Sequence, residues 1–228
     1  MFRLSMMTSA AALLVAGLSL AVPASAADLI IDGPALPGVV DVGGNWDGVY
    51  VGVFAGFGGA SLSEEGGSNL LDSSGAIDMT GGLIGVAAGV NFYLSDKIVG
   101  GVVGDIAWAN LSGDGDALYG SDASVNWLGS LRGKLGFDGG AIMPYLTAGL
   151  AFANAKVTNY DISDAYTDSN THIGWTVGAG VEIAATEDLS IDVLYRYSDY
   201  GAQEYEVYGT PDAGLTGHSV TVGLNWKF

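Results

Sequence analysis

After residue 27 the chain has no apolar run long enough to cross a membrane as a helix, yet hydrophobic residues alternate with other residues in eight separate segments. A membrane-spanning helix needs about 20 consecutive apolar residues. In hydrocarbon every backbone N–H and C=O needs a partner within the protein, so a membrane chain without such helices must close a sheet on itself. The connections between the segments are alternately long and short. The pattern predicts an all-β protein, an eight-stranded antiparallel up-and-down transmembrane β-barrel.

The predicted strands cover residues 46–60, 82–94, 98–111, 125–137, 141–155, 172–184, 189–200 and 217–228. The last of them alternates most cleanly, with Val220 and Val222 on one face and Thr221 and Gly223 on the other. One face of each strand is expected to contact lipid and the other the lumen. The first strand carries aromatic residues on both faces, so the pattern leaves its orientation open.

The N-terminal part of the chain predicts export. Residues 1–26 combine Arg3, an apolar stretch over residues 10–22 and a small-residue site at residues 24–26, as a cleaved signal peptide does. Residues 27–45 contain Pro and Gly without a sustained period, so we expect a periplasmic linker, with a plug in the lumen as the alternative. The predicted barrel domain is then residues 46–228. An even number of strands puts both of its ends in the periplasm.

The composition excludes some classes of protein. There are 25 Asp plus Glu against 7 Lys plus Arg, so nucleic acid is not an expected partner. The chain has no Cys, which rules out a disulfide scaffold. Only 14% of its residues are charged and 49% are hydrophobic, which departs from a soluble surface in the direction of lipid exposure.

The alternation places six charged residues on the inner face of their strands. Charges at mid-membrane depth are tolerable only inside a barrel, and an eight-stranded lumen is just wide enough for side chains to fill. We therefore interpret them as a salt-bridge network that fills the lumen; the alternative is a selectivity ring in a small porin-like channel for ions or small solutes. The predicted network is Asp105, Arg132, Lys134, Glu182, Asp192 and Arg196.

A second group of residues is predicted at the lipid interface, where aromatic side chains gather in membrane proteins. These aromatics are Trp108, Trp127, Trp175, Tyr195, Tyr197, Trp226 and Phe228. The expected contacts are outer-membrane lipid and lipopolysaccharide.

Most of the acid is predicted in the outer loops. The acidic residues are Glu64, Glu65, Asp72, Asp78, Asp114, Asp116, Asp122, Asp161, Asp164, Asp168, Asp199, Glu204, Glu206 and Asp212, offset only by Lys156. We interpret them as a solvated, repulsive rim. The alternative is that these carboxylates bind Ca²⁺ or Mg²⁺ together with lipopolysaccharide phosphates. Asp114-Gly115-Asp116 weakly favours such a site, but no complete metal-loop spacing is present. No metal is assigned, and the loops are the expected place for host or ligand contact.

Haem and catalysis are weaker hypotheses. An axial ligand for haem iron could come from His172 or from a set of loop and rim tyrosines. Acidic loops would repel the haem propionates, so no cofactor is expected. His218 and Ser219 are adjacent but lie on opposite faces of a strand, so no catalytic pair and no enzyme is predicted. The tyrosines are Tyr119, Tyr160, Tyr166, Tyr200, Tyr205 and Tyr208.

Five segments carry a family resemblance: residues 46–52, 101–105, 126–137, 174–182 and 195–201, of which residues 126–137 match a W-x-G-S-x-R-G-R-L-G-Y pattern most specifically. They resemble the Omp25/Omp31 family of outer-membrane proteins of alphaproteobacteria. The resemblance implies an eight-stranded barrel in the outer membrane, surface-exposed and concerned with envelope integrity or with host and ligand contact; some relatives are called porins and others bind haemin. The terminal Phe228 resembles the signal read by the barrel-assembly machinery, and Val103 and Leu194 stand where many members carry a lumenal Glu.

Overall fold

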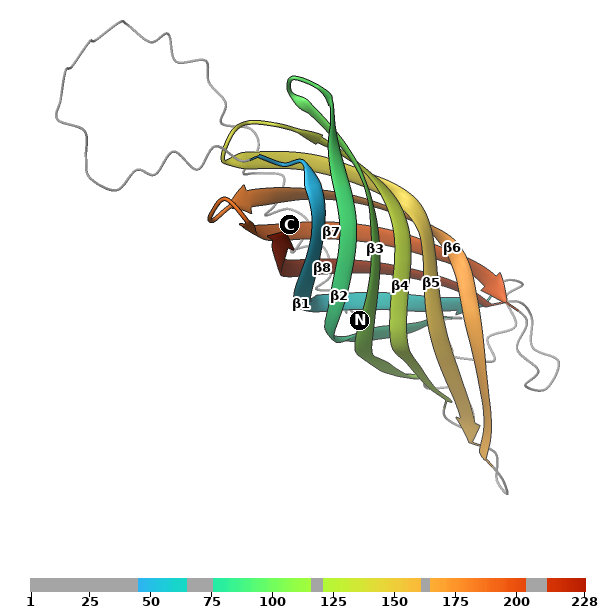
Figure 1. Ribbon diagram of the computed structural model, residues 1–228. Helices are drawn as coiled ribbons and strands as arrows, with labels where there is room; N and C mark the ends of the chain where they lie inside the picture. The colour runs from blue at the N-terminus through green and yellow to red at the C-terminus, as the bar shows by residue number, and fades with distance from the viewer. Residues whose placement is uncertain (1–44, 65–75, 116–120, 161–164, 204–212) are drawn as a thin grey trace, which may run out of the picture. The chain divides into compact units, whose positions relative to one another are not determined.

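Eight strands pair in chain order and close into one barrel (Figure 1). The computed structural model describes residues 45–64, 76–115, 121–160, 165–203 and 213–228. Every neighbouring pair is antiparallel, and β8 returns to β1. Among these residues no helix is long and apolar enough to cross a membrane. The predicted fold class is confirmed. The strands are β1 (Gly48–Glu64), β2 (Ala76–Ser95), β3 (Ile98–Gly115), β4 (Ser121–Phe137), β5 (Ile142–Tyr160), β6 (Ala165–Ala184), β7 (Leu189–Gln203) and β8 (Ala213–Lys227).

The barrel has two different ends. The turn end carries the short connections β2–β3, β4–β5 and β6–β7, together with the start of β1 and the end of β8. The loop end carries the four remaining connections. At the loop end every strand runs past its predicted limit; β6, for example, begins at Ala165 and pairs with Tyr160 of β5. The prediction was wrong there because it required apolar alternation, whereas strand pairing needs only backbone partners.

The longer strands change the position of several acids that the sequence assigned to loops. Six of them lie within strands, and the others fall outside the described residues. Among the six, the side chains of Asp78 and Asp199 are described: Asp78 is exposed on β2, and Asp199 of β7 accepts a hydrogen bond from the backbone of Gly201. The six are Glu64, Asp78, Asp114, Asp122, Asp168 and Asp199.

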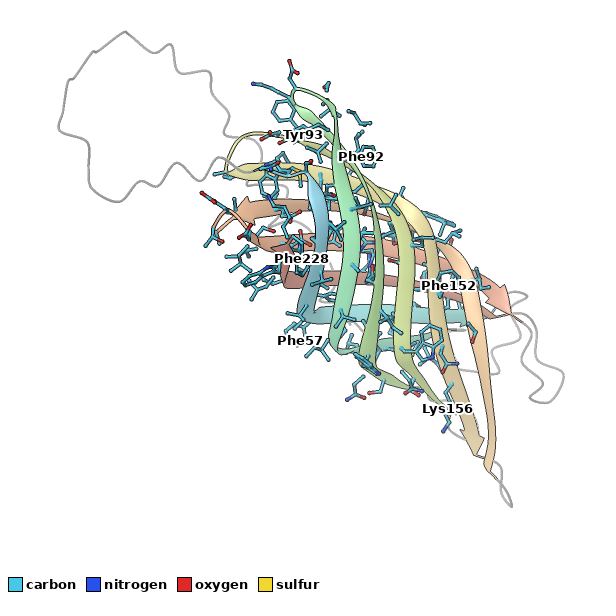
Figure 2. All side chains as sticks on the ribbon, viewed as in Figure 1. Phe57, Phe92, Tyr93, Phe152, Lys156 and Phe228 are labelled. Carbon is cyan, nitrogen blue, oxygen red and sulfur yellow. The ribbon has the colours of Figure 1, made fainter. Side chains whose placement is uncertain are left out.

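Large hydrophobic side chains on all eight strands are exposed on the outward face. Figure 2 shows the side chains projecting from the barrel wall, with Phe57 and Phe152 labelled. The predicted outward rows of β2 to β8 face outward in the structure. The structure also settles the orientation of β1, which the pattern left open: Val51 and Val53 are 46% and 57% exposed, and Tyr50 is 5% exposed. The alternation therefore predicted the two faces of the sheet correctly.

A register shift on β4 breaks the alternation near the loop end. Trp127 pairs with Asn154 and Val125 with Ala155, so Asn126 is an extra residue relative to β5. A bulge of this kind reverses the side to which the neighbouring residues point. Val125 is thereby turned inward and is only 1% exposed.

The interior is stratified along the barrel axis. Buried apolar residues fill the loop side; this loop-side cluster is Ile77, Met79, Leu111, Val125, Leu128, Ala151, Ala153, Tyr200 and Leu215. A smaller turn-side cluster is Trp46, Val99 and Met143, with Ala184 packed against it. Buried charged residues lie between the two clusters along the strands. The lumen is thus not uniformly polar.

Candidate functional site

The charged layer of the lumen is the site with the most chemistry, and its centre is the carboxylate of Asp105 on β3. Arg132 of β4 donates from Nη2 at 2.7 Å, and Arg196 of β7 donates from Nη1 at 3.1 Å. The Ser130 hydroxyl donates to the same carboxylate at 2.5 Å, and Arg132 also donates to Ser130 and to Thr147. The Asp105 side chain is 1% exposed. Two guanidinium groups and a hydroxyl thus satisfy one buried carboxylate.

A second carboxylate, Glu182 of β6, lies closer to the turn end. Lys134 of β4 donates to its Oε2 atom. Its Oε1 atom accepts from the Ser190 hydroxyl at 2.5 Å and from the Asn225 amide at 3.0 Å. The Lys134 ammonium also lies 4.4 Å from the centre of the Tyr145 ring. The charge of Lys134 is therefore compensated by a carboxylate and by an aromatic face.

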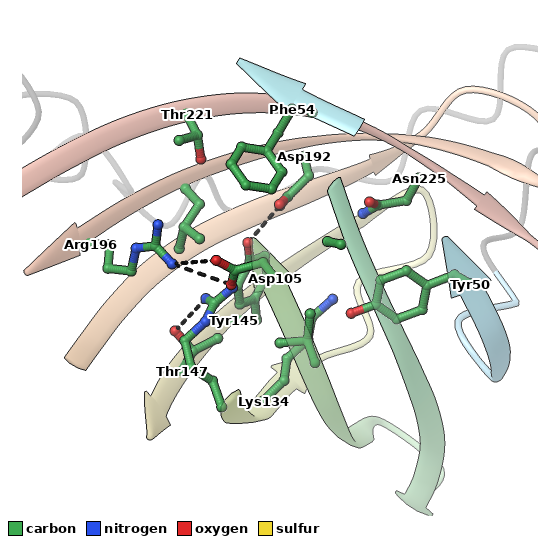
Figure 3. Close-up of a pocket in the computed structure, with 15 residues that line it drawn as sticks. Tyr50, Phe54, Asp105, Lys134, Tyr145, Thr147, Asp192, Arg196, Thr221 and Asn225 are labelled. Carbon is green, nitrogen blue, oxygen red and sulfur yellow. Dashed lines mark hydrogen bonds and ion pairs between the residues drawn. The ribbon is translucent and has the colours of Figure 1, made fainter. Parts of the chain in front are cut away.

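Asp192 is the third acid of the predicted network, and it makes no ion pair within the described part of the chain. Tyr145 donates its hydroxyl to Asp192 Oδ1 at 2.6 Å, and Figure 3 shows this bond beside the contacts of Arg196 with Asp105. The sequence predicted a network in which three acidic residues face three basic ones. In the structure both Arg132 and Arg196 pair with Asp105, because β3, β4 and β7 bring these three side chains to the same level of the barrel.

Small cavities remain within the charged layer and on either side of it. The central cavity has a volume of about 40 Å³, the turn-side one about 30 Å³ and the loop-side one about 20 Å³. Tyr50 and Asn225 border both the central and the turn-side cavity, and Arg196 borders both the central and the loop-side cavity. Val103 and Leu194, where the family resemblance implies Glu, line the central cavity as buried apolar residues. Each volume suits only one or a few water molecules.

The predicted interface aromatics lie on the outward face. Trp108 is 60% exposed, and Trp127, its cross-strand partner, is half-buried. Trp175, Trp226, Tyr195 and Phe228 are exposed, and Tyr197 is half-buried. Figure 2 shows Phe228 at the turn end of the barrel. The backbone N–H of Phe228 donates to the carbonyl of Val49, which ties the C-terminus to β1.

Aromatic residues also form one outward cluster on β6, β7 and β8. The rings of Trp175 and Tyr197 are 5.5 Å apart, and Tyr197 lies 4.9 Å from the His218 ring. The Tyr195 hydroxyl and His218 Nδ1 are 2.6 Å apart. His218 is outward, whereas Ser219 lies on the opposite face, as expected from strand geometry.

Two residues considered as rim groups are buried instead. Tyr200 is 6% exposed and belongs to the loop-side cluster, so its prediction as a rim tyrosine is wrong. His172 has no exposed surface and lies on the inward face of β6. Side chains of the other candidate tyrosines lie outside the described residues. Within the described part, no cluster of three or more His, Cys, Asp or Glu could hold a metal ion.

Three other features were not expected from the sequence. Trp46 was assigned to the first strand but precedes it, and it is buried in the turn-side cluster. Tyr93 was placed on an inner row, but it is 38% exposed and donates to Asp138 at the turn end. The apolar loop side was also missed, although Ile77 and Met79 continue the inward parity of β2. The sequence argument expected a polar lumen, so inward-facing apolar residues were not taken as evidence for an apolar cluster at the loop side.

Comparison with known proteins identifies the family. Residues 10–228 match the family model described as outer membrane protein beta-barrel domain. The chain is 35% identical over 210 residues to the 25 kDa outer-membrane immunogenic protein of Brucella abortus, covering 90% of this chain and 91% of that protein. It is 32% identical over 230 residues to the 31 kDa outer-membrane immunogenic protein of Brucella melitensis, with 91% and 95% covered. Among solved structures, Neisserial surface protein A matches with a TM-score of 0.44 and 21% identity, covering 79% of this chain and 97% of that one.

The sequence resemblance to the 25 kDa and 31 kDa proteins is therefore confirmed over most of the chain, and the predicted location in the outer membrane agrees with the names of these relatives. The chain belongs to the outer membrane protein beta-barrel family and is an integral outer-membrane protein.

Proposed function

We propose that this protein is a structural barrel of the outer membrane whose lumen is filled by side chains and does not conduct. The observation that carries this proposal is the stratified interior, in which ion pairs about Asp105 and Glu182 lie between two apolar clusters. The small volumes of the central, turn-side and loop-side cavities support it. Removing Asp105 would leave two buried guanidinium groups without their carboxylate, and removing Lys134 would leave Glu182 without its cation, so the layer favours the closed state.

A second part of the proposal concerns the outer surface. The turn end faces the periplasm, so the loop end stands outside the cell. β6 has 20 residues, whereas a tilted transmembrane strand needs only about 9–11. At about 3.3 Å per residue, the remainder lifts the loop-end tip of β6 roughly 20 Å above the hydrocarbon at a 45° tilt. The relatives are named immunogenic, which agrees with a surface-contact role for the acidic loop end.

Single-channel recording tests the closed lumen. The purified protein in a planar bilayer is expected to be silent, and so is Leu131→Ala, a matched truncation on the outward face of the same strand. Arg132→Ala removes a side chain that lines the central cavity and is expected to produce at most brief openings. Steady conductance of the wild type that changes with Arg132→Ala would refute the proposal and make this a pore with a charged constriction.

The envelope role has its own test. A strain lacking the protein is expected to become sensitive to detergents and bile salts, and both the wild type and a variant with residues 204–212 replaced by a Gly-Ser linker should restore resistance. Surface antibodies raised against the wild type should bind the linker variant less. Unchanged detergent and bile-salt sensitivity of the deletion strain would contradict the envelope role. The antibody measurement would then still test the surface-contact role separately.

A further inference from the structure

We propose that residues 45–47 form a strap across the turn end of the barrel, and that Trp46 is a releasable stopper that controls access from the periplasm to the lumen. The strap is defined as Asn45, Trp46 and Asp47, the residues that precede β1. The proposal is independent of conduction, because it concerns only one end of the lumen. It rests on burial, on hydrogen bonds, on the way the strap joins the barrel and on the cavity beneath it.

Burial shows that Trp46 fills the mouth of the barrel. Its side chain is 5% exposed, although it lies outside every strand. It packs on Val99 of β3 and Met143 of β5, both with no exposed surface, and Ala184 of β6 contacts the same cluster. These three residues come from three different strands around the mouth. Trp46 therefore closes the turn end of the lumen by contacting several strands of the barrel wall.

Hydrogen bonds hold the strap to separate points of the rim. The Trp46 indole N–H donates to the carbonyl of Gly140, in the β4–β5 turn, at 3.1 Å. Its backbone N–H donates to the Tyr93 hydroxyl at 3.5 Å, and that hydroxyl donates to Asp138 at 2.7 Å. Lys227 of β8 donates to the carbonyl of Asn45. The strap is thus fixed to β2, to the β4–β5 turn and to β8.

The way in which the strap joins the barrel makes it releasable. It has no partner in the strand register, which begins at Gly48. Gly48, the first residue of β1, joins the strap to the strand with a φ of 120°, a conformation that side-chain-bearing residues rarely adopt. Segments held by a few side-chain contacts open at a lower free energy than strands paired on both sides. The strap can therefore open while the barrel stays closed.

The turn-side cavity is the space that Trp46 separates from the periplasm in this proposal. Asn45 and Trp46 form part of its wall, and Glu182 and Asn225 of the charged layer form another part. Asn91 also lines it; this side chain is 5% exposed, and its Oδ1 atom accepts no hydrogen bond from the described residues. Buried carbonyl oxygens without a donor are rare and costly. The cavity thus offers an acceptor to a water-sized hydrogen-bond donor that enters when Trp46 leaves.

Cysteine labelling tests the stopper, because the chain has no native Cys. The reporter is Val99→Cys, beneath Trp46, and the control reporter is Val125→Cys in the loop-side cluster. The full barrel is reconstituted in lipid and treated with a trimethylammonium methanethiosulfonate reagent, which does not enter hydrocarbon. Heat-modifiable gel mobility confirms that each variant is folded.

The proposal expects Trp46→Ala to speed labelling of the Val99→Cys reporter by about tenfold or more, with the Val125→Cys reporter unchanged. Trp46→Phe, which keeps an aromatic ring but loses the bond to Gly140, should give a smaller increase. If Trp46→Ala does not fold, Tyr93→Phe serves instead: it removes an exposed hydroxyl that holds the strap, and about a twofold to threefold increase is expected. Equal labelling rates with and without these changes, or equal acceleration at both reporters, would overturn the proposal.

Discussion

Neutralising Asp105 gives the sharpest test of the charged layer. Asp105→Asn keeps the side-chain volume but removes the charge that Arg132 and Arg196 share at 2.7 and 3.1 Å. Both arginine side chains are at most 7% exposed, so bulk solvent does not reach the two guanidinium groups. Removing one partner of a buried ion pair costs about 3–5 kcal/mol. The free energy of unfolding should therefore fall by about 4 kcal/mol.

Asp192→Asn is the matched control. It makes the same chemical change on the same face of the sheet, but Asp192 has one described hydrogen bond, from Tyr145, and no described ion pair. A neutral amide still accepts that bond, so the expected loss is only about 1 kcal/mol. Urea unfolding in phospholipid vesicles, followed by tryptophan fluorescence, measures both variants. A loss for Asp105→Asn no larger than that for Asp192→Asn would refute the inference that Asp105 is the centre of the layer.

Three further predictions use the same unfolding assay. Lys134→Met leaves the carboxylate of Glu182 buried without its cation and should cost about 3 kcal/mol or more; a change below about 1 kcal/mol would contradict the pairing. On the outward face, Leu131→Arg should cost about 2–4 kcal/mol because it lies midway along the apolar row, whereas Phe57→Arg, at the loop-side border of its row, should cost about 1 kcal/mol or less. Equal costs would show that the two positions do not differ in membrane depth. Gly149→Ala should cost about 1–3 kcal/mol, because its Cβ would lie 2.1 Å from the carbonyl oxygen of Leu131 on the neighbouring strand. Gly133→Ala is its control and should be nearly neutral, since the nearest atom to its Cβ is 3.8 Å away.

The two faces of the sheet could be predicted from the sequence because alternation and sheet geometry share a period of two residues. Arg132 and Lys134 share one parity, and their charges alone identify the inner face of β4. The bulge at Asn126 could not be predicted, because a single extra residue leaves no local signature and reverses the side of Val125.

Which charged residues pair with each other could not be predicted from the sequence, for a different reason. Which side chains meet across a barrel depends on the stagger between strands, and that stagger is a property of the closed sheet. Alternation put Asp105, Asp192 and Arg196 inside but could not show that Arg196 reaches Asp105. The role of Trp46 was missed because a strand pattern that begins slightly too early looks the same as one that begins at Gly48.

The inward charges also have a consequence for how the chain assembles. β3 and β4 contribute Asp105, Arg132 and Lys134, a net charge of +1, whereas β6 and β7 contribute Glu182, Asp192 and Arg196, a net charge of −1. The inward charges of these two strand pairs are therefore opposite in net sign before the strands meet. Contacts such as Arg196 with Asp105, 91 positions apart, form only when the second half arrives. Attraction between these inward charges favours the arrangement in which β7 lies at the level of β3 and β4, so that Arg196 reaches Asp105.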